Sequence, residues 1–282
     1  MGAPLASRKA GTLGLGRWRF MARRFFASRV VSVALYGLIM VVIIRTAMTG
    51  AEAMGYNWQW YRVPRYLYSH TDDGFQLGEI GFGLLASLGL SGLSFLLAVV
   101  FGMIIALLRL SDLVVGRAVA VGFLELVRNI PLLVLLYLFY YVLGPIFGLD
   151  RYWASVLCLG VFHAALVSEI FRAGILSVSR GQWEAASSIG MTTSQAYRLI
   201  IIPQSVRFML PPLTGEIVST LKSSAIVSVI GVAELTTIGR NIISDTYMSF
   251  EIWFTIAAVY LGVTLCISAF ATYLEHRYTT EK

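Results

Sequence analysis

Charged side chains are scarce in this sequence. Asp, Glu, Lys and Arg together account for 13% of its 282 residues, whereas hydrophobic residues account for 57%. Soluble domains carry about 25% charged residues, so the composition excludes an ordinary soluble enzyme. It indicates a protein that crosses the membrane several times.

Lysine is scarcer still, and its positions exclude a nucleotide site of the P-loop type. That site needs a Gly-Lys pair followed by Ser or Thr. The only lysines are Lys9, Lys222 and Lys282, and none follows a glycine. The sequence therefore contains no P-loop.

Cysteine is also rare, and it gives no sign of a metal site or a disulfide framework. Cys158 and Cys266 both lie in apolar runs, without the spacing of metal ligands. The sequence shows no His/Asp/Glu metal cluster, no Ser-His-Asp set and no paired acids near a helix end. We therefore predict no metal, no cofactor bound by this chain and no enzymatic activity.

Long apolar runs, in contrast, are abundant. A membrane helix needs about 20 apolar residues. Arg45 interrupts the first run, and Ala51 and Ala53 leave a cleaved signal peptide as the alternative, but we expect a helix there. The predicted fold is an all-α membrane protein of about six transmembrane helices, at 30–48, 81–108, 120–143, 152–176, 205–230 and 251–273.

The segments between the spans indicate an orientation. The tail 1–29 holds seven basic residues and no acid, which favours a cytoplasmic position beside membrane lipid over a nucleic-acid-binding arm. Six spans then place the loops 109–119 and 177–204 in the cytoplasm, together with the tail 276–282, so both termini are cytoplasmic. Residues 49–80 contain several Trp and Tyr residues and suit a periplasmic membrane interface.

A polar stretch at 179–203 lies between two apolar spans. Ser179 followed by Gln182 has the form of a capping box, so a helix is expected from about 180 to 189. Gly190 is a suitable residue to end it.

Thr192 followed by Gln195 repeats the capping pattern and predicts a second short helix to about residue 201. Pro203 should limit its continuation. Both helices would lie at the cytoplasmic face, where the small residues 185–188 suit a helix that lies in a partner's groove. The alternative is a loop that only joins two spans.

Several separated motifs resemble the permeases of ABC importers. The EAA loop of that family has Glu-Ala-Ala, a Gly six positions after the Glu, and a hydrophobic-Pro ending. The matching stretch here is GQWEAASSIGMTTSQAYRLIIIPQSVRFMLPP. Three further segments resemble the polar amino acid branch of that family. They are ELVRNIPLLVLLYLFYYVL (125–143), SEIFRAGILSVSRGQWEAA (168–186) and LKSSAIVSVIGVAEL (221–235).

The resemblance covers about 81–275 and implies a type I importer permease core in the bacterial inner membrane. The helix at 30–48 and the segment 49–80 would be additions to a five-helix core. The helices at about 180–201 would be coupling helices that bind a separate ATPase.

The resemblance also implies roles and partners. Glu184 would pair with a basic group of the ATPase. Ala185 and Ala186 would allow close approach, and Gly190 would form the bend. The implied partners are an ATPase dimer that binds ATP and Mg, a second permease subunit, identical or related, and a periplasmic amino acid-binding protein.

Ionisable residues inside the spans are costly, by about 2.5–3.5 kcal/mol each on insertion scales, and usually face a pathway or one another. Glu169 and Arg172 are three positions apart, as are Glu125 and Arg128. Residues at this spacing are neighbours on one helix face. We interpret both sets as structural ion pairs.

Glu216 is interpreted differently from these ion pairs, as a residue that lines the substrate path. It points about 120° away from Lys222 on a helix but shares a face with Ser223. A zwitterionic amino acid needs an anion for its ammonium group and donors for its carboxylate. We hypothesise that the substrate path is lined by Glu216, Lys222, Ser223 and Ser224. The alternative is that Glu216 binds a neighbouring helix.

Three further residues lead to expectations about the substrate, about packing and about the shape of a span. Many relatives carry an acid after the lysine where this chain has Ser223, which favours neutral or acidic amino acids as substrates and leaves basic amino acids or opines open. His163 has no carboxylate three or four positions away and is expected to be a hydrogen-bonded packing residue rather than a proton relay. Pro131 is expected to kink the third span.

The competing function is an ion-coupled secondary transporter of small zwitterions, which would need no ATPase. Such transporters often contain inverted repeats, and the sequence shows no convincing internal repeat. The docking loop would then have no purpose.

Overall fold

The computed structural model describes residues 29–71 and 74–279 of the 282. Nearly all of the predicted basic tail, 1–29, lies outside the described residues. The chain divides into two units, residues 1–58 and 59–282, and each is described by itself.

The first unit contains one described helix, α2 (Arg29–Ala53). It covers the predicted first span and is five residues longer at its C-terminal end. Its apolar side chains, such as Val33 and Leu38, are exposed, which is the surface expected of a helix that faces lipid. Residues 31–53 are long and apolar enough to cross a membrane.

The second unit begins with a short segment that combines helix and strand. It consists of η1 (Trp60–Arg62), α3 (Pro64–Leu67), β1 (Tyr68–Thr71) and β2 (Gly74–Leu77). The two strands pair antiparallel, with Tyr68 opposite Leu77. Sequence reasoning did not predict this hairpin, which sits within the region 49–80.

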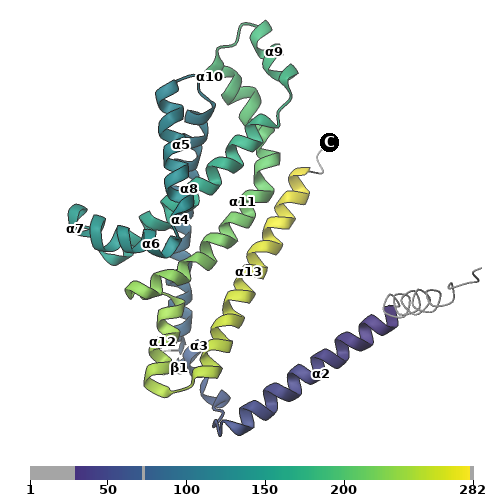
Figure 1. The fold of residues 1–282 in the computed structure, drawn as a ribbon, viewed down its shortest axis with the longest axis vertical. Helices are drawn as coiled ribbons and strands as arrows, with labels where there is room; N and C mark the ends of the chain where they lie inside the picture. Colours follow the sequence, from purple (N-terminus) through teal and green to yellow (C-terminus); the bar gives the residue numbers. More distant parts are fainter. Residues whose placement is uncertain (1–28, 72–73, 280–282) are drawn as a thin grey trace, which may run out of the picture. The chain divides into compact units, whose positions relative to one another are not determined.

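Four long helices form the body of the second unit (Figure 1). They are α4 (Glu79–Leu110), α8 (Arg151–Leu176), α11 (Ile202–Ser224) and α13 (Ser249–Thr279). Their positions match four predicted spans, although α13 includes residues that we assigned to the C-terminal tail. α4 and α8 approach closely, since a Cβ on Gly102 would lie 2.8 Å from Cγ1 of Val167. Small residues at such contacts are typical of membrane helix pairs.

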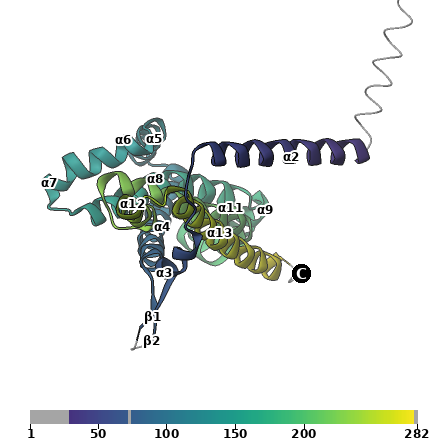
Figure 2. The same ribbon diagram turned by 90° about the horizontal axis from the view of Figure 1, so that it is seen from below.

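The predicted third span, 120–143, is not a single kinked helix. The structure has α5 (Val114–Asn129), then α6 (Leu132–Tyr137), the π-helical η2 (Leu138–Leu143) and α7 (Gly144–Phe147). The two halves are bent by 107° at the break, and α6 and α7 extend to one side in both views (Figure 1, Figure 2). Pro131 explains the break, because it forces extended backbone on Ile130 (φ −98°, ψ 127°). The described residues therefore contain five candidate spans, or six if the bent pair is one span.

The prediction that Pro203 would end the second short helix is wrong. α9 (Arg180–Ser188) is followed by α10 (Thr193–Ala196), the π-helical η3 (Tyr197–Ile201) and then directly by α11. The N–H of Ile202 donates to the carbonyl of Tyr197, five residues back. This wider turn lets the helix pass the proline, whose ring would crowd a regular α-turn.

One helix was missed from the sequence. After α11 come η4 (Ala225–Ile230) and then α12 (Leu235–Thr246), between the last two spans. The buried Glu234 caps α12 by accepting from the N–H groups of Thr236 and Thr237, at 2.8 and 2.7 Å. A carboxylate at this position is stabilised by the helix N-terminus.

The ends of the second unit differ. α9 and α10 lie at one end, and α3, β1 and α12 lie at the other (Figure 1). A main apolar core lies among α4, α5, α6 and α8. A second core near α12 and α13 includes Tyr66, Ile80, Leu235 and Ile252.

Candidate functional site

The loop between α8 and α11 forms the predicted pair of short helices. α9 ends at Ser188, and Gly190 adopts the left-handed conformation with φ +76°. The N–H of Met191 donates to the carbonyl of Ala186 at 3.1 Å, which closes the turn. Glycine takes this conformation without the steric cost that a Cβ brings. The bend expected at Gly190 is therefore confirmed.

The two predicted capping boxes have different outcomes. At Thr192 the box forms: its hydroxyl accepts from the N–H of Gln195, and the Gln195 side chain accepts from the N–H of Thr192. At Ser179 the helix starts as expected, but without a side-chain cap. Instead, Oε1 of Gln182 accepts from Gln204 Nε2 at 3.1 Å. Gln182 thus ties α9 to the start of α11.

The residues of α9 face in two directions. Ala186 is 1% exposed, whereas Glu184 and Ala185 are exposed. Trp183 stacks edge-on against Tyr197, with 4.9 Å between the ring centroids. These contacts fix the inner face of α9 to the chain itself. Ala186 therefore packs inward, and the close approach that we predicted for both alanines is open only at Ala185.

The exposed face of the loop carries small side chains and one large apolar side chain. The hydroxyls of Ser187 and Ser188 donate to carbonyls of their own helix, those of Trp183 and Glu184. Ile189 at the bend is 72% exposed, and no ion pair joins Glu184 to another residue of the described chain. A surface with an unpaired carboxylate and an exposed apolar residue is suited to another protein.

Glu169 on α8 is surrounded by three arginine side chains. Its carboxylate lies 2.5 Å from Nη1 of Arg109 on α4, 3.1 Å from Nε of Arg172 on its own helix, and 3.5 Å from Nη1 of Arg128 on α5. The predicted pair with Arg172 is confirmed. The predicted pair of Glu125 with Arg128 is wrong, because Arg128 turns to α8, and Glu125 accepts from Nδ2 of Asn129 at 3.1 Å.

Glu216 contacts a neighbouring helix, which is the alternative that we considered for it. Its Oε1 lies 2.5 Å from Nδ1 of His163 on α8. His163 is fully buried, and the Glu216 side chain is 12% exposed. His163 is therefore a buried, hydrogen-bonded residue, as expected, and Glu216 is its partner. Sequence spacing could not find this contact, because the two residues are 53 positions apart.

The other predicted path residues differ in their exposure to solvent. Lys222 is exposed and Ser223 is half-buried. Ser224 is fully buried, and its hydroxyl donates to the carbonyl of Leu221 at 2.7 Å. Within this subunit Ser224 therefore faces the interior of the helix bundle. Among the described residues, no three His, Cys, Asp or Glu side chains are grouped as metal ligands.

The fold and the loop together define a class of protein. A bundle of membrane-length helices carries, at one end, an exposed pair of short helices that continues without a break into a span. This is the architecture of a membrane transport subunit.

The family follows from sequence comparison. Residues 98–280 match the family described as "Binding-protein-dependent transport system inner membrane component", and the chain belongs to this family of ABC permeases. It is a multi-pass protein of the inner membrane. The resemblance predicted from the EAA loop is confirmed.

Similar proteins include two amino acid permeases. The chain is 35% identical over 210 residues to a probable glutamine ABC transporter permease, GlnM, of Bacillus subtilis, covering 73% of this chain and 94% of that protein. It is 34% identical over 193 residues to the nopaline permease NocM of Agrobacterium fabrum, covering 64% of this chain and 80% of that protein.

Solved structures agree with the fold. A crystal structure of an amino acid ABC transporter with histidines matches with a TM-score of 0.65 and 41% identity, covering 71% of this chain and 94% of that one. The MetNI methionine ABC transporter in an inward-facing conformation matches with a TM-score of 0.60 and 18% identity, over 70% and 94%. The second likeness concerns the fold alone.

Proposed function

We propose that this chain is the permease subunit of an ATP-driven importer that carries polar amino acids into the cell. The observation that carries the proposal is the α9–α10 loop, with Glu184 and Ala185 exposed on a helix that ends at the left-handed Gly190. The substrate class rests on relatives named for glutamine, nopaline and octopine. Both termini would be cytoplasmic.

The loop would transmit the movement of an ATPase dimer. Glu184 would pair with a basic group of the ATPase, and Ala185 would lie against its surface. Because α10, η3 and α11 are continuous, a displacement of the loop would move α11 inside the membrane. Two permease subunits, identical or related, would rock in this way between inward-open and outward-open states. ATP and Mg would be bound by the ATPase, and an external binding protein would deliver the substrate.

The path would pass Glu216. Its contact with His163 occupies one carboxylate oxygen and leaves the other for a substrate ammonium group. Lys222 and Ser223 would complete a polar surface for the carboxylate of the substrate. Since Ser223 replaces an acid, a cationic side chain would find no counter-charge there, and we favour neutral or acidic amino acids.

The experiment is uptake into proteoliposomes that contain the permease, its ATPase and its binding protein. We expect uptake that requires ATP and that glutamine or glutamate inhibits more strongly than arginine or lysine. Glu216→Gln should reduce this uptake. Uptake by the permease alone, driven by an ion gradient, would favour a secondary transporter instead. Unchanged uptake by Glu216→Gln would remove Glu216 from the path.

A further inference from the structure

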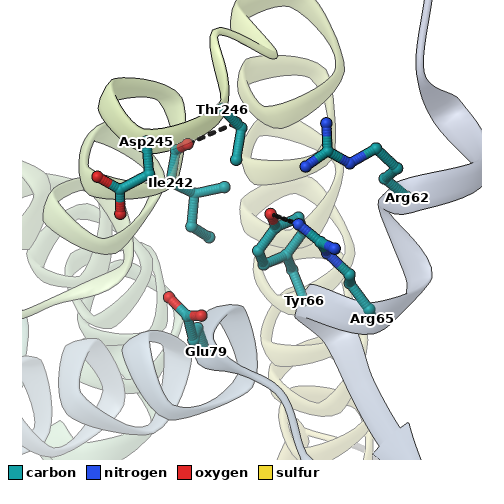
Figure 3. A pocket seen from close by; sticks show the side chains of 7 residues that line it. All are labelled: Arg62, Arg65, Tyr66, Glu79, Ile242, Asp245 and Thr246. Atoms are coloured by element: carbon teal, nitrogen blue, oxygen red, sulfur yellow. Dashed lines mark hydrogen bonds between the residues drawn. The ribbon is translucent and has the colours of Figure 1, made fainter.

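A charged cleft of about 420 Å³ lies beside α12, and the function proposed above makes no use of it. The segment before α4 contributes Arg62, Arg65 and Tyr66. Figure 3 shows the two arginines on one side of the cleft and two carboxylates, Glu79 and Asp245, on the other. The remaining lining residues are Ile242 and Thr246.

The charges of this cleft are not paired with one another. Arg62 donates from Nη1 to Oε1 of Gln59 at 2.5 Å, and Arg65 donates from Nη2 to the hydroxyl of Tyr66. Within the described part of the chain, neither arginine forms an ion pair, and neither does Glu79 or Asp245. Glu169, by comparison, has three guanidinium groups around it. Guanidinium groups without a carboxylate are free to bind one that another molecule supplies.

Two exposed tyrosines are sequence neighbours of residues that line the cleft. Tyr61, next to Arg62, is 80% exposed, and Tyr247, next to Thr246, is 81% exposed. Tyr247 also has a positive φ of 59°, which residues other than glycine seldom adopt. Tyrosine and arginine are the residue types that contribute most at protein–protein contacts. The composition therefore suits a protein surface as the partner.

The position of the cleft in the fold indicates which side of the membrane the cleft faces. It lies at the α3 and α12 end of the second unit, opposite α9 and α10 (Figure 1). If α9 faces a cytoplasmic ATPase, the cleft faces outward. Arg62 and Arg65 precede residues 98–280, the part that matches the family, so the arginine side of the cleft comes from outside the matched region.

We propose that this cleft is a docking point for the external binding protein. Arg62 and Arg65 receive a carboxylate side chain of that protein, Glu79 and Asp245 receive a basic one, and Tyr61 and Tyr247 pack on its surface. The partner class follows from the family, whose members take part in binding-protein-dependent transport. The inference rests on the proposed function for its orientation. Complementary charges at such a contact set specificity and association rate more than total affinity.

The test uses the complete complex of permease and ATPase in nanodiscs, with ATPase activity titrated by the substrate-loaded binding protein. For the double variant Arg62→Glu/Arg65→Glu we expect the half-maximal concentration of binding protein to rise roughly tenfold, about 1.4 kcal/mol, with the maximal rate unchanged. The effect should shrink at high salt, because exposed charges are screened. Arg117→Glu, an exposed arginine near the opposite end, is the control and should not change this concentration.

Two results would overturn the inference. One is a titration curve that the double variant does not shift, or that changes only in maximal rate. The other is loss of radiolabelled glutamine binding to the complex measured without binding protein, which would make the cleft a solute site. If the wild-type complex does not respond to binding protein at all, the proposed function itself fails, and the double variant is not needed to show it.

Discussion

At the scale of single residues, the two alanines of the EAA loop have opposite environments. Ala186 is buried and Ala185 is exposed. We expect Ala186→Leu to destabilise the protein by about 1–3 kcal/mol, because a larger side chain must displace packed neighbours. Ala185→Leu, the matched control, should leave the unfolding temperature of the purified permease in detergent unchanged. Equal melting curves for the two variants would show that the inward packing of Ala186 is wrong.

His163 and Glu216 also act as a pair at this scale. His163→Ala removes the partner of a largely buried carboxylate, which should cost about 1–3 kcal/mol of stability. In the double variant His163→Ala/Glu216→Ala no carboxylate remains unpaired, so its loss should be smaller than the sum of the two single losses. Thermal unfolding of the four proteins measures this coupling. Strict additivity would mean that the 2.5 Å contact contributes nothing.

At the scale of elements, Glu169 joins three helices through Arg109, Arg128 and Arg172. Glu169→Gln should lower stability by about 1–3 kcal/mol, because the charged hydrogen bonds to α4, α5 and α8 weaken together. Glu125→Gln is the control: within the described part of the chain, its exposed side chain has only Asn129 as a partner, so the change should be near zero. A larger effect from Glu125→Gln would contradict the arrangement.

The elements also show how far the sequence predicts the structure. Apolar length placed α4, α8 and α13 within a few residues at most ends, because a lipid-crossing helix must be long and apolar. The same signal could not give the 107° bend after α5 or the passage of the helix through Pro203. Both depend on how the backbone rearranges around a proline, by a break in one case and a π turn in the other.

Partners across helices were predicted less well than the elements themselves. Spacing along one helix found Glu169 with Arg172 but assigned Arg128 to the wrong acid. It could not find the contact of His163 with Glu216, which joins α8 to α11. Such contacts are decided by how the helices are packed. The cap of α12 by Glu234 was missed for a different reason, since a helix of 12 residues between two spans is too short to give the length signal of a membrane span.

At the scale of the whole molecule, the second unit carries a different surface at each of its two ends. α10 is joined to α11 through η3 without a break, and α11 contacts α8 through Glu216 and His163. α12, which carries part of the charged cleft, packs against α4 and α13 at the other end. A force applied to the loop would therefore reach the middle of the spans through a continuous helix rather than through a flexible linker.

We propose that a separate ATPase moves this chain by binding the loop around Gly190. The most direct measurement is ATP-dependent amino acid uptake, with recovery of the ATPase on the purified permease, for wild type and for Ala185→Arg/Gly190→Arg. Arginine at Ala185 blocks the exposed face of α9, and arginine at Gly190 disfavours the left-handed bend. Both uptake and ATPase recovery should fall to background. A double variant that keeps its ATPase and transports at the wild-type rate would show that the loop is not the point where the ATPase acts.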